Sequence, residues 1–488
     1  MLQLERKDLI VTHAWIANDR VASSDGRVFA VENPADGSLV AEVADCGATE
    51  ARAAAHAAHH AFSCWRRLLA KERAAHLQAW LALVRKNQED LARLISLEQG
   101  KPLAESRGEV AYGAAYIEWF AEEAKRAYGN VIPETAPGRK IIVTKEPVGV
   151  AAAITPWNFP IAMLARKIAP ALAAGCTIVA KPAEDTPLSA LALALLAAEA
   201  GIPAGVINVV PASRQRAASV ADAWLADDRV RKLSFTGSTA VGKHLAAASA
   251  PTLKRLSLEL GGNAPFIVFD DADLDLAVKG MIAAKFRNAG QTCICANRIY
   301  VADAIYDDFA ERAVQAVSKL RVGPAGDGDA EIGPLINARA LEKVERHVAN
   351  AIERGARLLI GGKRHALGRY FYEPTVLVDV DSSMNVACEE TFGPVAPLFR
   401  FYSEEGVIAA ANSTPFGLAA YFYSRDIARV MRVSAALEAG MVGINEAAIS
   451  TEVAPFGGVK DSGYGREGSL YGMDEYLQTK YLCLGGLS

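Results

Sequence analysis

The chain has 488 residues, of which 51% are hydrophobic and 22% are charged, and its formal net charge is −4. This length exceeds what one ordinary hydrophobic core supports, so the sequence predicts a folded globular protein with two or three domains. The two signs of charge are interspersed, which excludes the concentrated basic patch that nucleic acid or an anionic membrane surface requires.

The sequence shows no targeting pattern. Its first residues lack the basic, apolar and small-residue succession of a secretory signal. The longest apolar run covers residues 168–180, which is shorter than the roughly 18 residues that span a bilayer. We therefore expect a cytoplasmic protein without a membrane anchor. Its seven scattered cysteines would stay reduced there and form no disulfide framework.

The first third of the chain predicts helices, because residues 51–61 and 71–97 place Leu, Ala and Trp at three- and four-residue intervals among charges. From residue 141 onward, short β-branched runs alternate with Ala- and Leu-rich stretches. These runs cover residues 141–143, 148–154, 177–180, 206–210 and 232–235. Strands separated by helices are typical of right-handed crossovers on a parallel sheet, so this region predicts an α/β domain.

A second strand–helix series follows from residue 264 to about residue 445. It comprises helical patterns at 274–286 and 305–320 and strand patterns at 418–423 and 442–444. The two series meet at Glu259-Leu-Gly-Gly-Asn, a glycine-rich segment typical of a hinge or a tight turn. Residues 139–145 and 476–484 are β-type stretches outside both series, and we expect them to pair with each other as an accessory sheet.

The segment Gly237-Ser-Thr-Ala-Val-Gly242-Lys243-His244 has the spacing of a phosphate loop after a predicted strand. That loop needs Ser or Thr after its Lys to hold Mg²⁺, and His244 cannot take this role, which argues against a nucleoside-triphosphatase. The same glycines at a strand-to-helix turn suit a dinucleotide, whose pyrophosphate binds backbone N–H groups at a helix N-terminus. Taken alone, the segment fits an ordinary glycine-rich turn equally well.

Cys293 lies in the small-residue segment Asn288-Ala-Gly-Gln-Thr-Cys293-Ile-Cys295. A lone cysteine is usually a small buried hydrophobe, and the chain has no Cys or His pair at the spacing of a metal site. If Cys293 is a nucleophile, its base is expected to be a carboxylate, because none of the eight histidines lies in a motif-like setting. Glu259 is the candidate, since an acid in an apolar setting has the raised pKa that suits a general base near neutrality.

Seven short motifs, each weak alone, follow one another along the chain. They are Thr155-Pro-Trp157-Asn158-Phe159-Pro160, Lys181-Pro-Ala-Glu184, Phe235-Thr-Gly237-Ser238, Glu259-Leu-Gly-Gly, Gly290-Gln-Thr-Cys293, Glu389-Glu390-Thr-Phe392-Gly-Pro394, and Pro455-Phe-Gly-Gly458 with Ser462-Gly463. In order and spacing the series resembles the aldehyde dehydrogenase superfamily. The resemblance covers nearly the whole chain, from about residue 12.

The resemblance implies a mechanism. Cys293 would add to the aldehyde carbon as a thiolate, and the Asn158 amide with the Cys293 backbone N–H would stabilise the resulting oxyanion. Hydride would pass to a nicotinamide and leave a thioester, which Glu259 would hydrolyse by activating water. A hydrolase that uses the same thiol is a competing interpretation. So is a non-catalytic paralogue, although such a protein would be expected to have lost one of these three residues.

The resemblance also implies a dinucleotide site, while the missing Cys or His pair at ligand spacing predicts no metal. The residues of the dinucleotide site would be Trp157, Lys181, Glu184, Gly237, Ser238, Gly242, Leu260, Glu390 and Phe392. Glu184 would chelate the ribose hydroxyls and repel a 2′-phosphate, so NAD is predicted over NADP. Some members of the superfamily accept both.

Two arginines carry the substrate prediction. Arg166 lies eight residues after Asn158, and Arg287 lies six residues before Cys293. Two cations at an apolar tunnel indicate an anionic guest, for which a carboxylate is the natural choice. The combination resembles the succinate-semialdehyde dehydrogenase branch, in which a serine corresponding to Ser450 also holds the carboxylate. The predicted substrate is therefore succinic semialdehyde, with glutaric semialdehyde or a broader set of ω-carboxylate aldehydes as the alternative.

Cys295 is a candidate redox partner of Cys293. Residues two apart in a turn can reach the roughly 4.4–6.8 Å between Cα atoms that a disulfide accepts, and such a bond would switch off the nucleophile under oxidant. Simple packing of Cys295 is an equally good interpretation.

The superfamily resemblance implies three structural parts. Residues 1–130 and 146–258 would form a Rossmann-like NAD-binding domain, and residues 259–468 would form a catalytic domain. Residues 131–145 and 469–488 would form a β arm that exchanges between subunits, giving a homodimer or a homotetramer.

Overall fold

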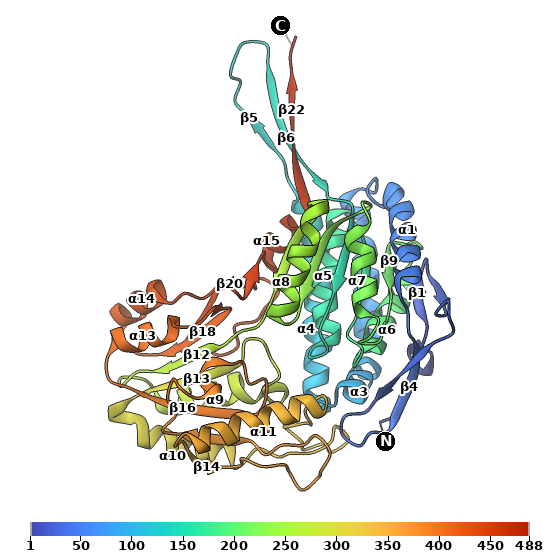
Figure 1. Cartoon of the computed structure of the whole chain (residues 1–488). Coiled ribbons are helices and arrows are strands. Elements are labelled where there is room, and N and C mark those ends of the chain that lie inside the picture. Colours follow the sequence, from blue (N-terminus) through green and yellow to red (C-terminus); the bar gives the residue numbers. More distant parts are fainter. Residues whose placement is uncertain (1, 487–488) are drawn as a thin grey trace.

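The computed structural model describes residues 2–486, which form two α/β units and a β arm that projects away from both (Figure 1). The units are built on separate sheets, of eight and seven strands. This is the predicted fold class. The search of helices within the described part of the chain finds none long and apolar enough to cross a membrane.

The first unit is built on a mostly parallel sheet. Its strands, in spatial order, are β2 (Asp19–Val21), β1 (Ala14–Ile16), β9 (Ile207–Val209), β8 (Thr177–Lys181), β7 (Val150–Ile154), β10 (Val230–Thr236), β11 (Arg255–Glu259) and β21 (Gly463–Tyr464). The five strands from β9 to β11 are parallel, and the outer strands β1, β2 and β21 pair antiparallel. The sheet therefore follows the predicted crossover pattern at its centre.

Alternate residues of β7 face the two layers of helices that cover this sheet. Ala151 and Ala153 pack into one core, and Val150 and Ala152 pack into the other. The first core includes residues of α2 (Ala70–Lys86), α3 (Gln88–Gln99), α4 (Leu103–Glu123), α5 (Pro160–Ala174) and α6 (Pro187–Glu199). The second includes residues of α1 (Ala48–Trp65), α7 (Ala217–Ala226) and α8 (Thr239–Ser249).

Two details of the first third were wrong in the prediction. Residues 14–44 are not helical, because they form β1, β2 and the antiparallel pair β3 (Val28–Glu32) and β4 (Leu39–Ala44). The predicted helix over residues 71–97 is two helices, which meet at Asn87. The Asn87 side-chain amide donates to the Leu83 carbonyl at 2.8 Å, a local bond of the kind that competes with helix continuation.

The second unit is built on a sheet with one antiparallel edge. Its strands, in spatial order, are β14 (Arg357–Ile360), β15 (Thr375–Val378), β16 (Val395–Phe401), β13 (Ala296–Ala302), β12 (Ala264–Val268), β18 (Ala419–Tyr423) and β19 (Met441–Ile444). All neighbouring pairs are parallel except β14 with β15. Its helices are α9 (Leu274–Phe286), α10 (Tyr306–Val317), α11 (Ala338–Glu353), α12 (Asn385–Cys388), α13 (Glu404–Asn412) and α14 (Ile427–Ala436).

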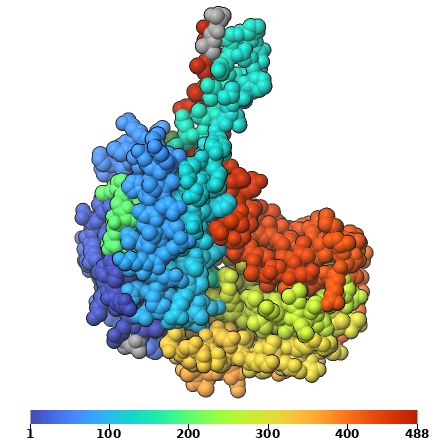
Figure 2. Space-filling model, turned by 180° about the vertical axis from the view of Figure 1, so that it is seen from behind, coloured from blue at the N-terminus to red at the C-terminus, as the bar shows by residue number. Residues whose placement is uncertain are grey.

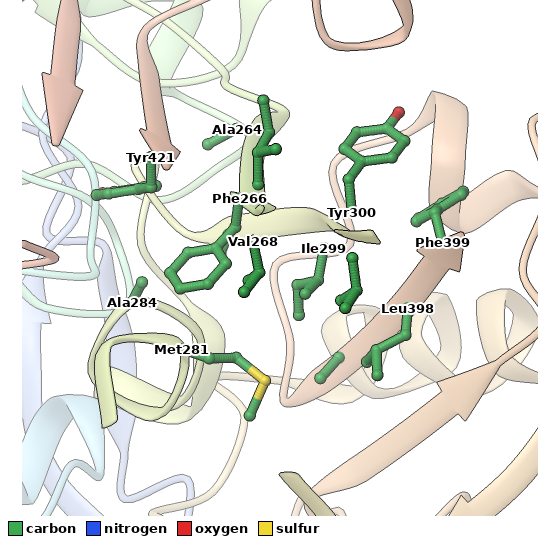
Figure 3. Packing of buried hydrophobic residues seen from close by; sticks show 14 of the residues in the cluster. Ala264, Phe266, Val268, Met281, Ala284, Ile299, Tyr300, Leu398, Phe399 and Tyr421 are labelled. Carbon is green, nitrogen blue, oxygen red and sulfur yellow. The ribbon is translucent and has the colours of Figure 1, made fainter. Parts of the chain in front are cut away.

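The core of the second unit lies between this sheet and its helices. Figure 3 shows Met281 and Ala284 of α9 beside Phe266 and Val268 of β12, with the buried side chains of β13 and β16 continuing the layer. The predicted helix at 274–286 coincides with α9. Both predicted strands, at 418–423 and 442–444, are also present as β18 and β19.

The arm is a three-stranded antiparallel sheet of β22 (Leu477–Leu484), β6 (Lys140–Pro147) and β5 (Asn130–Ile132). Its register runs from Leu477 opposite Pro147 to Leu484 opposite Lys140, which confirms the predicted pairing of two distant segments. Figures 1 and 2 both show the arm extending away from the two units. The remaining short elements are α15 (Ser469–Asp474), β17 (Phe416–Gly417), β20 (Val459–Lys460), and the 3-10 turns Lys7–Leu9, Ala124–Arg126, Ala250–Thr252, Arg287–Gly290 and Asp303–Ile305.

Candidate active site

A cavity of about 500 Å³ opens at the carboxyl ends of the parallel strands β7, β8, β10 and β11. The opposite wall comes from the second unit, through the segment around Cys293, the start of α11 and the segment of residues 390–392. The crevice outside the carboxyl ends of parallel strands is where open α/β sheets bind their ligands. The volume also lies within the usual range for a small-molecule site, roughly 300–1,000 Å³.

The three predicted catalytic residues, Asn158, Glu259 and Cys293, all line this cavity. Asn158 follows β7, Glu259 is the last residue of β11, and Cys293 follows the turn after α9. Asn158 and Glu259 are buried and Cys293 is half-buried. Segments that are far apart in the sequence therefore bring a thiol, a carboxyl group and a side-chain amide to one space.

Asn158 is held through both its main chain and its side chain. Its carbonyl accepts hydrogen bonds from Lys101 Nζ at 2.6 Å and from Asn288 Nδ2 at 3.0 Å. Its side-chain Nδ2 donates to the Gln291 carbonyl at 3.1 Å. A side-chain amide has two N–H donors, so one donor remains for a guest in the cavity.

The segment before Cys293 has an unusual backbone. Asn288 and Ala289 have φ angles of 51° and 53°, the left-handed region that non-glycine residues seldom occupy. Gln291 fixes the segment, because its Nε2 donates to the Asn288 carbonyl at 3.1 Å and its Oε1 accepts from the Ile336 N–H at 3.0 Å. Gly262 permits a close approach, since a Cβ atom there would lie 2.3 Å from the Cys293 carbonyl oxygen. The backbone under Cys293 is therefore tightly constrained.

Burial raises the pKa of the Cys293 thiol to about 12. Charged neighbours act on this pKa in opposite directions. The positive charges of Arg166 and Arg287 lower it, and the carboxylates of Glu390 and Glu259 raise it. The thiol is thus protonated at neutral pH in this state. Thiolate formation requires a base or a change in this electrostatic balance.

The pKa of Glu259 is raised well above its usual value, first by burial and then by the charge of Glu467. Arg166 and Lys167 oppose this effect, and both form ion pairs with Glu467. Neither carboxyl oxygen of Glu259 has a hydrogen-bond partner among residues 2–486. A buried carboxyl group with a raised pKa and free oxygens has the properties of a general base that works near neutrality.

Four of the predicted cofactor residues lie at the β8 and β10 end of the cavity. They are Lys181, Glu184, Gly237 and Ser238. Ser238 is the N-cap of α8, and its Oγ accepts from the Val241 N–H at 3.5 Å, so the glycine-rich turn does lead from a strand into a helix N-terminus. The Gly237 N–H is already engaged, because it donates to the Glu259 carbonyl at 3.0 Å.

Four more predicted cofactor residues line the cavity near Cys293. They are Trp157, Leu260, Glu390 and Phe392. The Trp157 and Phe392 rings meet edge to face with centroids 5.6 Å apart. Burial raises the pKa of Glu390 to about 7, and its Oε1 accepts from the Gly262 N–H at 3.2 Å.

Gly242 does not line the cavity. A Cβ atom at this position would lie 2.3 Å from Leu260 Cδ2, so the glycine allows α8 to pack closely on Leu260. The prediction of a direct cofactor contact followed from the spacing of a phosphate loop. The structure places Gly242 one turn into the helix, where close packing on Leu260 leaves no room for a side chain.

The buried guanidinium of Arg166 lies on α5, three residues after the cavity-lining Met163. It is 1% exposed, pairs with Glu467, and lies over the Phe456 ring with Cζ 4.5 Å from the centroid. Its terminal nitrogens, Nη1 and Nη2, have no hydrogen-bond partner among the described residues. These donors are therefore available to an anion.

The other predicted substrate residues, Arg287 and Ser450, are less enclosed. Arg287 is exposed and lies over the Phe159 ring with Cζ 4.9 Å from the centroid. Ser450 Oγ lies 2.5 Å from the hydroxyl of Tyr112, which in turn lies 3.0 Å from the Tyr116 hydroxyl. Neither arginine lines the cavity, and nor does Ser450, although the charges of both arginines lower the pKa of the Cys293 thiol.

Cys295 is buried, and both it and Cys293 are free thiols. The Cys295 Sγ accepts a hydrogen bond from Lys285 Nζ at 3.2 Å and contacts the Lys285 carbonyl at 3.5 Å. A bond between Cys293 and Cys295 would have to displace Cys295 from Lys285. The redox switch stays a prediction.

The sequence prediction missed several residues at the cavity and behind it. Asn337, Arg339 and Lys343 line it from the start of α11, which Asn337 caps by accepting from the Ala340 N–H at 3.2 Å. An N-cap residue followed by basic residues was the available signal. Tyr112 and Lys101 had no such signal, because their roles come from contacts with distant segments.

The whole chain matches known proteins. The profile of the aldehyde dehydrogenase family matches residues 21–482. A 3-sulfolactaldehyde dehydrogenase from Pseudomonas putida is 59% identical, and each of the two chains is covered completely. An NADP(+) succinate-semialdehyde dehydrogenase from Escherichia coli K12 is 57% identical over 99% of this chain and 100% of its own.

Two further proteins extend the comparison. A glutarate-semialdehyde dehydrogenase from Pseudomonas aeruginosa is 56% identical over all of both chains. The crystal structure of a succinate-semialdehyde dehydrogenase from Burkholderia pseudomallei superposes with a TM-score of 0.98, at 57% identity over 99% of this chain and 100% of that one. The chain belongs to the aldehyde dehydrogenase family.

Proposed function

We propose that this enzyme oxidises short aldehydes that carry an anionic group at the far end, with succinic semialdehyde as the principal substrate and NAD as the hydride acceptor. Glutaric semialdehyde, which is one carbon longer, is the alternative. The observation that carries the proposal is the buried guanidinium of Arg166, whose terminal nitrogens have no hydrogen-bond partner among residues 2–486. Arg166 already pairs with Glu467, but buried donors without a hydrogen-bond partner are costly unless a further acceptor binds there.

The relatives support the same class of substrate. Three of them are named for succinate semialdehyde, glutarate semialdehyde and 3-sulfolactaldehyde. Each of these molecules is a short aldehyde with an anionic group at the other end. The two arginines and Ser450 are the residues that we propose to hold this group.

The contents of the cavity support the proposed catalytic roles. The Cys293 thiol passes its proton to water, and the thiolate adds to the aldehyde carbon and forms a thiohemiacetal, while the free donor of the Asn158 amide stabilises the oxyanion. A bound dinucleotide would supply the hydride acceptor, and loss of hydride from that carbon would leave a thioester on Cys293. Glu259 then takes a proton from water, whose oxygen adds to the thioester carbon, and the acid leaves as Cys293 becomes free.

The cavity residues fit a dinucleotide. Lys181 is buried at one end, where its Nζ donates to the Pro182 carbonyl at 3.0 Å, and Glu184 lies three residues later. Glu390 is a half-buried carboxyl group at the other end. We propose that Lys181 and Glu184 hold the adenosine ribose and that Glu390 holds the nicotinamide ribose, with Trp157 and Phe392 beside it.

Removal of Arg287 tests the substrate assignment. Because this residue is exposed, Arg287→Ala is expected to fold normally. Loss of one charge-assisted contact of about 1.5–3 kcal/mol lowers kcat/KM for succinic semialdehyde by roughly 10- to 150-fold, mainly through KM. The reaction is followed as NADH formation at 340 nm, with succinic and glutaric semialdehydes, acetaldehyde, butyraldehyde and benzaldehyde.

The controls separate charge recognition from general damage. Arg364→Ala removes an exposed arginine that pairs with Glu345 on α11, and it should leave all rates unchanged. Butyraldehyde has no charge, so its kcat/KM should be the same in the wild type and in Arg287→Ala. A wild type that treats all these aldehydes alike would refute the substrate proposal and leave family membership intact.

The preference for NAD rests on Glu184, which lines the cavity with Lys181. Two unit charges about 4 Å apart at an effective dielectric near 20 repel by roughly 4 kcal/mol, so a 2′-phosphate beside Glu184 is disfavoured. The name of the Escherichia coli relative carries NADP(+), which makes this preference a point to test. We propose NAD as the preferred cofactor, with NADP turned over more slowly.

Neutralising Glu184 is expected to change the cofactor ratio. Glu184→Gln should raise kcat/KM for NADP relative to NAD by at least about 10-fold, because it removes the repulsion of the phosphate and weakens the contact with the ribose hydroxyls of NAD. Asp185→Asn, at the neighbouring position, serves as the matched control. Equal use of the two cofactors by the wild type would contradict the proposal.

The arm supports a proposal about assembly. Its strands expose large apolar side chains, at positions Val131, Ile132, Tyr481, Leu482 and Leu484. Exposed apolar surface on a projecting sheet is typical of a subunit contact. We propose a cytoplasmic homodimer or homotetramer in which the arm, residues 131–145 and 469–488, contacts a second copy. The NAD-binding and catalytic domains would be residues 1–130 with 146–258 and residues 259–468.

A further inference from the structure

A buried ion pair lies behind the Asn158 side of the cavity. Lys101 precedes α4 and Glu109 lies on it, and both side chains are completely buried. The Lys101 Nζ lies 2.6 Å from Glu109 Oε2 and 4.0 Å from the centroid of the Phe159 ring. A buried pair of charges persists only when its remaining polar atoms are also satisfied, so the other partners of the pair indicate its purpose.

Those partners are the backbone groups that flank the Phe159-Pro160 segment. Lys101 Nζ donates to the Asn158 carbonyl at 2.6 Å. Glu109 Oε1 accepts from the Ile161 N–H at 2.8 Å, at the start of α5, where the first N–H groups have no partner inside the helix. The lysine thus holds the chain just before the turn, and the carboxylate holds it just after the turn.

This arrangement fixes the orientation of the Asn158 side-chain amide. The carbonyl of Asn158 accepts a second hydrogen bond from Asn288, and its Nδ2 donates to the Gln291 carbonyl. With the main chain held by two donors and one amide hydrogen engaged, the second amide hydrogen has a fixed direction. Donors that are fixed before the reaction stabilise developing charge without any reorganisation.

We propose that Lys101 is a positioning residue for the oxyanion donor. Its ammonium group, balanced by Glu109, holds the Asn158 main chain so that the side-chain amide meets the oxygen of the thiohemiacetal. Lys101 does not touch the substrate and acts only through Asn158. The proposal rests on the oxyanion role proposed above for Asn158.

The test removes both charges together, because Lys101→Met alone would leave the Glu109 carboxylate buried and unpaired. The double variant Lys101→Met/Glu109→Gln is expected to lower kcat by about 10- to 100-fold, less than loss of an oxyanion donor itself. The loss should appear both in aldehyde oxidation and in hydrolysis of p-nitrophenyl acetate, and the KM for NAD should change less than about 2-fold. Rates are expressed per active site, counted by thiol titration, so that unfolded protein does not contribute.

Two comparisons distinguish positioning from a purely structural role. Lys101→Gln in the Glu109→Gln background keeps a donor and should lose less activity than Lys101→Met in the same background. In an Asn158→Ala background, the Lys101 and Glu109 changes should lower kcat by less than about 2-fold, because residues that act through one group are not additive.

The outcomes distinguish failure of the Lys101 proposal from failure of the oxyanion role of Asn158. If Asn158→Ala lowers kcat and the Lys101→Met/Glu109→Gln loss adds to it in full, Lys101 does not act through Asn158, and this proposal is overturned while the oxyanion role stands. If Asn158→Ala leaves kcat unchanged, the oxyanion role fails and the proposal fails with it. Equal losses of activity for Lys101→Met and Lys101→Gln in the Glu109→Gln background would also overturn the positioning role of Lys101.

Discussion

Cys293→Ala is expected to abolish steady-state oxidation of every aldehyde, with a fall in kcat of at least about 10⁴-fold, the scale on which loss of a covalent nucleophile acts. No other described thiol lines the cavity, so none can take over its role. Binding of the dinucleotide should survive, since the residues proposed to hold it are untouched. The rate is followed at 340 nm, and cofactor binding is followed by quenching of protein fluorescence.

Cys295→Ala is the matched control for this change. Its sulfur contacts Lys285 and does not line the cavity, so kcat should stay within about 3-fold of the wild type, as for a volume-reducing change at a buried site. Substantial NADH formation by Cys293→Ala would refute the role of Cys293. If Cys295→Ala lowered kcat as much as Cys293→Ala does, the conformation of the segment that contains both cysteines, and not the Cys293 sulfur, would account for the loss.

Glu259→Gln is expected to stop the enzyme after the first half of the reaction. The thioester should form and hydrolyse slowly, because the amide cannot take a proton from water, and kcat should fall by about 10²- to 10⁴-fold. The expected signature is a burst of about one NADH per active site followed by a slow steady rate. Stopped-flow absorbance at 340 nm measures both phases.

The pH dependence provides a second readout of this residue. The pKa of Glu259 is raised, so its carboxylate form, which we propose to act as the base, becomes populated only as the pH rises through that value. The rate of thioester hydrolysis should therefore increase with pH in the wild type and lose this dependence in Glu259→Gln. Glu390→Gln, which changes a half-buried carboxyl group in the same cavity, should keep this dependence and instead raise the KM for NAD. Absence of a burst together with a low rate would place the role of Glu259 before hydride transfer.

Much of the fold could be predicted from local patterns. The helix at 274–286 and the strands at 418–423 and 442–444 carry periodicities strong enough to stand out in one sequence. The strands within residues 14–44 were missed because they are short, three to six residues each, and lack a strong alternation. The break at Asn87 was missed because a single side-chain bond to Leu83 accompanies it.

The candidate site likewise contains residues that the sequence could predict and residues that it could not. Asn158, Glu259 and Cys293 could be predicted because their motifs stand in a recognisable order, and all three reach one cavity. Contacts over long sequence distances leave no such trace. Tyr112 and Ser450 are 338 positions apart, and neither has a neighbouring pattern that points to the other. Gly242 is the converse case, a motif position that does not line the cavity and at which close packing on Leu260 accounts for the glycine.

The ion pair of Lys167 with Glu467 has a consequence for the order of events during synthesis. The two residues are 300 positions apart, and Lys167 and Arg166 are both buried beneath the first sheet. Until residue 467 has left the ribosome, two cations of the first unit lack the carboxylate with which they form ion pairs, and breaking a buried ion pair is strongly destabilising. The first unit therefore cannot reach its final packing as it emerges. It must wait for the second unit to be translated, so the two are expected to fold as one cooperative whole and not one after the other.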